Sequence, residues 1–161
     1  MPQRRRDATI LADMTTQQPS GLIEEALTSS IIGAFFVVHK QLGFGFLEQI
    51  YASALEIELR DRGHQVARQF GAVVRYKGIE IAHQRIDMVI DNKVIVELKS
   101  TEKLHRDANR QVLDYLRATT FEVGLLLHFG RDANFQRVVY QTARTSPVDS
   151  LPSADHSSTT A

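Results

Sequence analysis

One stretch of alternating apolar and polar residues, from Arg85 to Thr101, constrains the fold of this 161-residue chain more than any other feature. The alternation runs on both sides of a short polar segment, Asp91-Asn92-Lys93. A period of two residues is typical of β-strands with one buried face, and a short polar segment between two such runs is typical of a tight turn. The stretch therefore predicts an antiparallel hairpin with one face in the core. That core face would carry Ile86, Met88, Ile90, Val94, Val96 and Leu98.

The same pattern predicts the register of the hairpin. With Asp91-Asn92-Lys93 as the loop, Asp87 lies directly opposite Glu97 on the neighbouring strand. A two-residue loop would instead place Asp87 opposite Leu98, and would put the apolar residues of the two strands on different faces. Because the three-residue loop keeps the apolar residues together, we expect Asp87 and Glu97 to be adjacent on the second face. Lys99 follows two residues later on that face.

Two adjacent carboxylates and a lysine suggest a chemistry. Asp87 and Glu97 would repel each other unless a proton or a cation lay between them. Carboxylate oxygens at this spacing suit Mg²⁺ or Mn²⁺. Lys99 could hold or help deprotonate an attacking water, or stabilise negative charge on a phosphate. These are the components of metal-assisted phosphodiester hydrolysis, although ordinary cross-strand pairs on a solvent-exposed face would use the same residue types.

Helical and strand-like patterns alternate along the rest of the chain. We expect helices at about 22–42, 47–62 and 103–118, and strands at 65–76, 79–82, the hairpin 85–100, 122–129 and 135–140. Gly71 is a candidate site for a β-bulge. The continuous apolar run from Glu122 to Phe129 suits a strand covered on both faces. This order of elements predicts an α/β layered domain with a mixed sheet.

The apolar stripes of the three helices predict their buried faces. The stripes comprise Leu22, Ile23, Ala26, Leu27, Ile31, Ala34, Phe35 and Val38 in the first, Leu47, Ile50, Ala54, Leu55 and Leu59 in the second, and Ala108, Val112 and Leu116 with Leu113 at the edge in the third. Beside these stripes, Glu48 and Tyr51 are neighbours on the second helix, and Gln111 and Tyr115 are neighbours on the third. On spacing alone, Glu48 favours the helix dipole and Tyr51 packs.

Composition limits the class of protein. The chain contains no cysteine, which excludes disulfides and thiolate catalysis. No apolar run reaches the length of a membrane span and no signal-peptide pattern is present, so we expect a cytoplasmic protein. The polar termini, 1–20 and 142–161, are expected to be disordered, and 21–141 to form one domain.

The net charge is +0, with 19 basic and 19 acidic residues, so only a local asymmetry of charge could favour nucleic acid. Basic residues gather on both sides of the hairpin, although each could simply be solvated. The two groups are Arg60, Arg62, Arg68, Arg75 and Lys77 before it, and Lys99, Lys103, His105, Arg106, Arg110 and Arg117 within and after it. The six histidines show no metal-ligand spacing. His39 and His128 are expected at the edge of the core, with His39 also a weak site candidate.

Several short motifs, in one order, resemble a known family. They are Val38-His39, Leu42-Gly43, Gly45-Phe46-Leu47-Glu48-Gln49-Ile50-Tyr51, Tyr76-Lys77-Gly78, Arg85-Ile86-Asp87, Val94-Ile95-Val96-Glu97-Leu98-Lys99, Gln111-Val112-Leu113-Asp114-Tyr115-Leu116, Gly124-Leu125-Leu126-Leu127 and Phe129-Gly130. Together they are similar to the GxxExxY group of the PD-(D/E)XK nuclease-like superfamily, over about residues 22–141. One departure is Phe44, where the group usually has proline between two glycines.

This resemblance implies a restriction-endonuclease-like three-layer α/β core, with a mixed central sheet flanked by helices. It also implies site roles for matching residues. The implied metal ligands are Glu48, Asp87, Glu97 and the Leu98 carbonyl, with Mg²⁺ or Mn²⁺ as the ion. Lys99 matches the catalytic lysine, and Gln111 and Tyr115 match a pair that positions lysine, water or substrate.

Three functional hypotheses follow. The first is a Mg²⁺-dependent nuclease that cleaves DNA or RNA. The second is a nucleic-acid-binding or adaptor protein that has the same fold without catalysis. The third and weaker one is a homodimeric scaffold that uses a sheet edge or the first helix.

Overall fold

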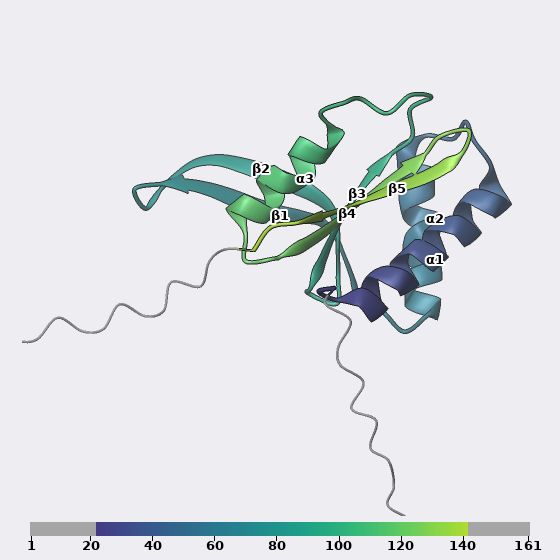
Figure 1. Cartoon of the computed structure of the whole chain (residues 1–161), viewed down its shortest axis with the longest axis horizontal. Coiled ribbons are helices and arrows are strands. Elements are labelled where there is room, and N and C mark those ends of the chain that lie inside the picture. The colour runs from purple at the N-terminus through teal and green to yellow at the C-terminus, as the bar shows by residue number, and fades with distance from the viewer. Residues whose placement is uncertain (1–21, 142–161) are drawn as a thin grey trace, which may run out of the picture.

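The computed structural model describes residues 22–141, so the disorder expected for 1–20 and 142–161 lies outside the described part of the chain (Figure 1). The elements, in chain order, are α1 (Glu25–Leu42), α2 (Glu48–Asp61), β1 (Val66–Tyr76), β2 (Ile79–Ile90), β3 (Val94–Lys99), α3 (Ala108–Ala118), β4 (Val123–Phe129) and β5 (Ala133–Val139). The separate strands expected at 79–82 and 85–90 form one continuous strand, β2. The third helix begins at Ala108 rather than near Lys103. None of the helices between residues 22 and 141 is long and apolar enough to cross a membrane.

The five strands form one mixed sheet in the order β1-β2-β3-β4-β5. β3 and β4 are parallel, and α3 makes the crossover between them, whereas the other neighbours are antiparallel. In the turn between β2 and β3, Ile90 pairs with Val94, which is the register of the predicted three-residue loop. The mixed sheet expected from the order of the elements is confirmed.

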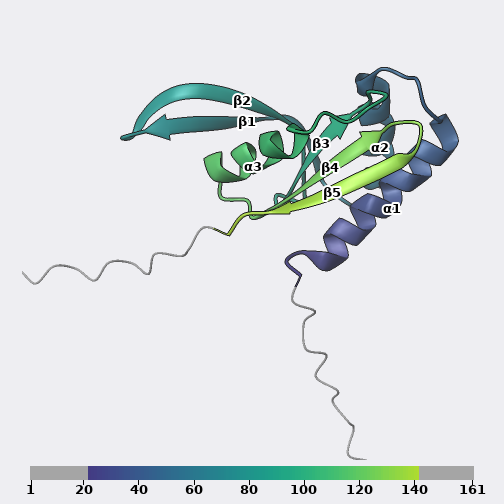
Figure 2. The ribbon, with the colours of Figure 1, turned by 45° about the horizontal axis from the view of Figure 1, so that its top comes forward.

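Helices cover both faces of the sheet, which makes the predicted three-layer α/β fold (Figure 2). On one face α1 and α2 pack through Ile31, Phe35 and Leu55 against apolar side chains of β3 and β4. On the other face α3 packs through Val112 and Leu116. Their partners in the sheet include Val94, Val96, Leu98, Leu125 and Leu127 on the first face, and Val89, Ile95 and Leu126 on the second.

The hairpin of β2 and β3 is buried on both faces, so the prediction of a single buried face was wrong. Val89 and Ile95, which the alternation assigned to the outer face, are covered by α3. Glu97 is only 3% exposed. Period-two patterns report which side chains alternate, but a later helix that covers the second face cannot be seen in the hairpin itself. Glu97 therefore lies in the interior, and Asp87 is partly buried, rather than both lying on a wet surface.

Where β1 pairs with β2, the predicted core residue Ile86 lies on the opposite face of the sheet. Ile86 packs in the cluster under α3, although Met88 of the same strand packs against α1 and α2. Gln69 of β1 has a positive φ of 51°, and its place in the ladder is opposite Asp87. The alternation of β2 reverses at this point. Beyond it, β1 and β2 continue as an arm that projects past α3, with its register shift at Val74/Arg75 and not at Gly71 (Figures 1 and 2).

Several residues assigned to helical core stripes are exposed instead. Leu47 is 75% exposed and Ile50 is also exposed, while Tyr51 takes the buried position on α2. Leu22 and Ala26, at the start of the first predicted stripe, are both exposed as well. The other predicted core residues of α1 and α3 are buried or partly buried, including Ile31, Phe35, Val38, Val112 and Leu116. The two residues of the second predicted stripe that are exposed against expectation, Leu47 and Ile50, flank Glu48 in the chain.

Candidate active site

Asp87 and Glu97 occupy the position where β2 and β3 separate. The paired ladder between these strands ends at Met88 and Val96, one residue before the two carboxylates. Asp87 Oδ2 instead accepts a 2.8 Å hydrogen bond from the backbone amide of Leu98. β2 and β3 are interior strands of the sheet, and beyond the end of their ladder the carboxylate of Asp87 connects them.

Glu97 has one oxygen paired and one oxygen free. Lys99 Nζ donates to Glu97 Oε1 at 3.1 Å. Glu97 Oε2 is buried and has no hydrogen-bond partner. Burial, followed by the negative charge of Asp87, raises the pKa of Glu97 to about 7, against a partial lowering by Lys99. A buried carboxylate oxygen without a partner is costly, so this atom is suited to accept a cation or to carry a proton.

Glu48 reaches the same site from the opposite layer. It lies in the first turn of α2 and is partly buried. Burial raises its pKa, the charge of Asp87 raises it further, and Lys99 lowers it. The charges of Asp87 and Lys99 both act on Glu48, so Glu48 lies in the neighbourhood of these two residues.

The loop before α2 positions Glu48. Gly43 and Gly45 have φ angles of 70° and 114°, in the region that favours glycine. The buried hydroxyl of Tyr51 donates to the Gly43 carbonyl at 2.5 Å and accepts from the Phe46 amide at 3.2 Å. Its ring stacks on Phe129 at 4.3 Å. Tyr51 thus connects the loop to the core one turn after Glu48, a role that spacing alone did not distinguish from ordinary packing.

Gln111 and Tyr115 approach the carboxylates from α3. Gln111 Nε2 donates to the Tyr115 hydroxyl at 2.7 Å, and that hydroxyl donates to the Arg85 carbonyl at 2.9 Å. Burial raises the pKa of Tyr115 to about 12, and the charges of Glu97 and Asp87 contribute to the rise. The structure therefore brings both residues of the predicted pair to the site.

The carboxylates of Asp87 and Glu97 could supply some, but not all, of the ligands of a hard divalent cation. Among the described residues, 22–141, no three His, Cys, Asp or Glu side chains form a complete metal-binding group. Two features still favour a cation at Asp87 and Glu97: the unpartnered Glu97 oxygen, and the raised pKa of Glu97, which a positive charge would lower. Mg²⁺ commonly takes one or two carboxylates and keeps several waters, so a closed cage of side chains is not required.

The basic groups around the site differ in their pairing. Most arginines that precede the hairpin are neutralised by ion pairs: Arg60 and Arg68 with Glu56, Arg62 with Glu58, and Arg75 with Glu80. By contrast, Lys103, Arg106 and Arg110 form no ion pair within residues 22–141 and are exposed. Among the described residues, Lys40, Lys77 and Arg85 before β3 also form no ion pair. Of the unpaired cations after β3, Lys103 lines the same hollow as Lys99.

The two histidines at the core edge have structural partners. His39 Nε2 is 2.7 Å from the Gly130 carbonyl, and His128 Nε2 is 2.6 Å from the Thr101 carbonyl. His128 is buried and holds the segment that follows β3 against β4. Both contacts agree with the expected position at the edge of the core.

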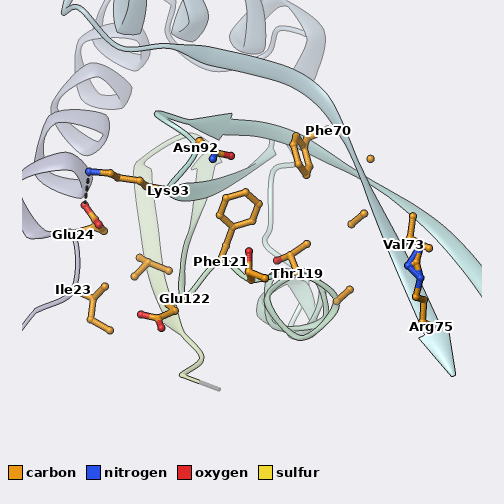
Figure 3. A pocket seen from close by; sticks show the side chains of 15 residues that line it. Ile23, Glu24, Phe70, Val73, Arg75, Asn92, Lys93, Thr119, Phe121 and Glu122 are labelled. Carbon is orange, nitrogen blue, oxygen red and sulfur yellow. Dashed lines mark ion pairs between the residues drawn. The ribbon is translucent and has the colours of Figure 1, made fainter. Parts of the chain in front are cut away.

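A separate cavity of about 640 Å³ lies beneath the β1–β2 arm (Figure 3). Its wall includes Phe70 and Phe121, whose rings meet edge to face at 5.7 Å, and the ion pair of Lys93 with Glu24. None of the candidate site residues lines it. Because it lacks the carboxylates and Lys99, we do not assign the chemistry to this cavity.

Comparison with known proteins identifies the family. A sequence profile for the PD-(D/E)XK nuclease superfamily matches residues 25–138, which include every residue of the candidate site. The chain belongs to the PD-(D/E)XK nuclease superfamily. This membership supports a nuclease-type function and agrees with the three-layer fold that places Asp87, Glu97 and Lys99 together.

A solved structure and the curated proteins add less. The superfamily member described here is similar to a structure titled "Crystal structure of SSO0001", with 14% sequence identity and a TM-score of 0.48. The match covers 72% of this chain and 59% of that one. The chain thus spans about three-fifths of that structure's length. No curated protein is significantly similar to the chain.

Proposed function

We propose that this superfamily member is a Mg²⁺- or Mn²⁺-dependent nuclease of the GxxExxY group that hydrolyses phosphodiester bonds of nucleic acid. The observation that carries the proposal is the buried, unpartnered oxygen of Glu97 between Asp87 and Lys99. PD-(D/E)XK nucleases typically use divalent metals. The loop geometry supports assignment to the GxxExxY group, because the motif tyrosine, Tyr51, fixes the segment that carries the motif glutamate, Glu48.

Asp87 and Glu97 would hold the cation, with Glu48 and the Leu98 carbonyl as further oxygen donors. Such an ion supplies a polarised water and neutralises charge on the phosphate. The chain's own residues orient the reaction. The Lys99 ammonium is held beside Glu97, where it can position the attacking water or stabilise the developing negative charge.

Gln111 and Tyr115 act as positioning residues in this proposal. Tyr115 connects α3 to the Arg85 carbonyl, and Gln111 is held by the Tyr115 hydroxyl. The Gln111 side chain lines a hollow of about 410 Å³ together with Lys99. It is therefore placed to orient the lysine, a water or a substrate phosphate, as the family pattern implies.

The test is hydrolysis of labelled single- and double-stranded DNA and RNA by purified protein with Mg²⁺ or Mn²⁺. We expect cleavage of at least one substrate that EDTA abolishes and that Asp87→Ala reduces by a factor of about 100 or more. Equal residual cleavage by wild type and Asp87→Ala would attribute the activity to a contaminant and reject the proposal.

One observation favours the alternative of a non-catalytic binding protein on the same fold. The ion pair between Lys99 and Glu97 already neutralises part of the carboxylate charge without a metal. A protein of this kind would bind nucleic acid in a salt-dependent manner that survives Asp87→Ala, and would show no Mn²⁺ affinity by calorimetry. A homodimer and a cytoplasmic location remain further proposals, which sedimentation and fractionation would test.

A further inference from the structure

Large apolar side chains are exposed beside Glu48. Phe44, Phe46, Leu47 and Ile50 are all exposed, and Leu47 directly precedes Glu48 in the chain. Single exposed apolar residues are common on soluble proteins, but here four lie within seven residues of the chain. We call these four residues the apolar wall. The helical hydrophobic pattern predicted that Leu47 and Ile50 would be buried, but both are exposed. Local violations of such patterns concentrate at functional sites.

A second, basic surface lies on the other side of Lys99. The hollow that contains Lys99 and Gln111 is bordered by Lys103 and His105, in the segment between β3 and α3. Within residues 22–141, Arg106 and Arg110 also have no acidic partner, and they line the neighbouring hollow between α3 and β5. Asp107 lines both hollows, so the two are adjacent. We call Lys103, Arg106 and Arg110 the basic wall.

Contacts through the β4–β5 turn connect the two walls. The guanidinium of Arg131 lies 5.2 Å from the centre of the Phe44 ring and donates to Glu102 at 3.2 Å. Glu102 directly precedes Lys103. Figures 1 and 2 both show the α1–α2 loop, the segment after β3 and the β4–β5 turn at the same end of the sheet. The candidate carboxylates and Lys99 therefore lie between an apolar and a basic surface.

We propose that this site takes nucleic acid whose nucleotides are unpaired where the strand is cut, with bases on the apolar wall and phosphates on the basic wall. In a duplex the base faces are stacked inside, and the outside offers phosphates and polar groove edges. Aromatic side chains bind the exposed faces of unpaired bases with little dependence on sequence, while lysine and arginine follow the backbone. The inference rests on the proposed nuclease function and specifies its substrate.

Binding, measured without cleavage, tests the inference. Lys99→Ala protein with Mg²⁺ is titrated against a fluorescent single strand of mixed sequence and against the same strand in a blunt duplex. We expect the single strand to bind at least about tenfold more tightly at equal salt. In the same background, Phe46→Ala should weaken single-strand binding by about tenfold, and Phe46→Trp should retain it.

Matched controls separate the two walls from general surface effects. Ile57 is an exposed apolar residue of α2, outside the wall, and Ile57→Ala should leave binding unchanged. Arg110→Ala should reduce the slope of log affinity against log salt by about one. Arg62 is paired with Glu58, and Arg62→Ala should not change that slope. Thermal denaturation of each variant confirms that it is folded.

Three binding results would overturn the inference, and a sedimentation result would do so too. The binding results are equal or tighter binding of the duplex, no binding of either substrate, and an effect of Phe46→Ala no larger than that of Ile57→Ala. A change from dimer to monomer in sedimentation on Phe46→Ala, without a change in strand binding, would identify the apolar wall as a protein interface and also overturn it. Tight single-strand binding without cleavage of any substrate would instead reject the nuclease proposal alone.

Discussion

The Asp87 carboxylate accepts a hydrogen bond from the Leu98 amide at 2.8 Å, where the regular pairing of β2 and β3 has ended. One side chain therefore joins the two strands and also contributes charge to the site. These two roles can be separated, because an asparagine retains an oxygen acceptor but loses the negative charge.

Asp87→Asn should preserve stability and abolish cleavage. Its side-chain oxygen can still accept the Leu98 hydrogen bond, and loss of the charge relieves the repulsion with Glu97. We expect the free energy of unfolding to stay within about 1 kcal/mol of wild type, whereas Asp87→Ala should lose about 1–3 kcal/mol. Urea denaturation measures both. Wild-type rates of metal-dependent cleavage by Asp87→Asn would show that the carboxylate charge is not needed.

The raised pKa of Glu97 predicts how stability depends on pH in the absence of metal. The folded state binds a proton with a pKa of about 7, compared with 4.5 for an unperturbed carboxyl. The folded state is therefore favoured below pH 4.5, and this contribution, on the order of 3 kcal/mol, is lost as the pH rises to 7. Thermal denaturation between about pH 5 and 8 should show this fall in wild type and not in Glu97→Gln.

Divalent metal should counteract the loss of stability that accompanies rising pH. A cation favours the ionised form of Glu97, so Mn²⁺ or Mg²⁺ should raise Tm more at about pH 8 than at about pH 6. In Glu97→Gln the metal-induced shift should disappear at both pH values. A shift of equal size in wild type and Glu97→Gln would place the metal elsewhere on the protein.

Tyr51→Phe should slow catalysis through the loop that carries Glu48, because Tyr51 is a positioning residue. The substitution removes the hydroxyl that contacts Gly43 and Phe46 and so releases the loop that carries Glu48. We expect a loss of about 1–2 kcal/mol in the free energy of unfolding and a fall of about tenfold or more in cleavage rate. Tyr76 is exposed at the tip of the arm, and Tyr76→Phe serves as the matched control. Equal rates for the two variants would contradict the positioning role.

Gly124→Ala should destabilise the domain through overpacking. A Cβ at Gly124 would lie 2.4 Å from Val112 Cγ1, because α3 packs closely over β4. We expect a loss of about 1–3 kcal/mol in the free energy of unfolding. At Gly71 a Cβ would meet no heavy atom within 4 Å and φ is not positive, so Gly71→Ala should be neutral or slightly stabilising. Similar losses of stability in both variants would show that overpacking against Val112 is not the cause.

The register of the central hairpin could be predicted from the sequence because it depends on local information. The alternation of apolar residues around Asp91-Asn92-Lys93 admits one loop length that keeps them together, and Ile90 does pair with Val94. The continuous apolar run of β4 likewise predicted a strand buried on both faces, and Val123–Phe129 is buried throughout.

Features that depend on long-range packing could not be predicted in this way. The burial of Glu97 follows from α3, which lies later in the chain and covers the second face of the hairpin. The change of face between Ile86 and Met88 lies opposite Gln69, a residue of β1 with a positive φ, and no local pattern in β2 marks it. Leu47 and Ile50 fitted a helical stripe, but the inward side of α2 carries Tyr51, which stacks on Phe129, together with Ala52, Leu55 and Leu59.

The central claim is that Lys99, beside Asp87 and Glu97, takes part in metal-dependent phosphodiester hydrolysis. The most direct measurement is the single-turnover cleavage rate of one labelled substrate by Lys99→Ala and by Lys93→Ala, under identical Mg²⁺ or Mn²⁺ conditions. Lys93 is an exposed lysine in the turn of the same hairpin. We predict that Lys99→Ala reduces the rate by about 100-fold or more while Lys93→Ala retains the wild-type rate. Equal rates for the two variants would contradict the account.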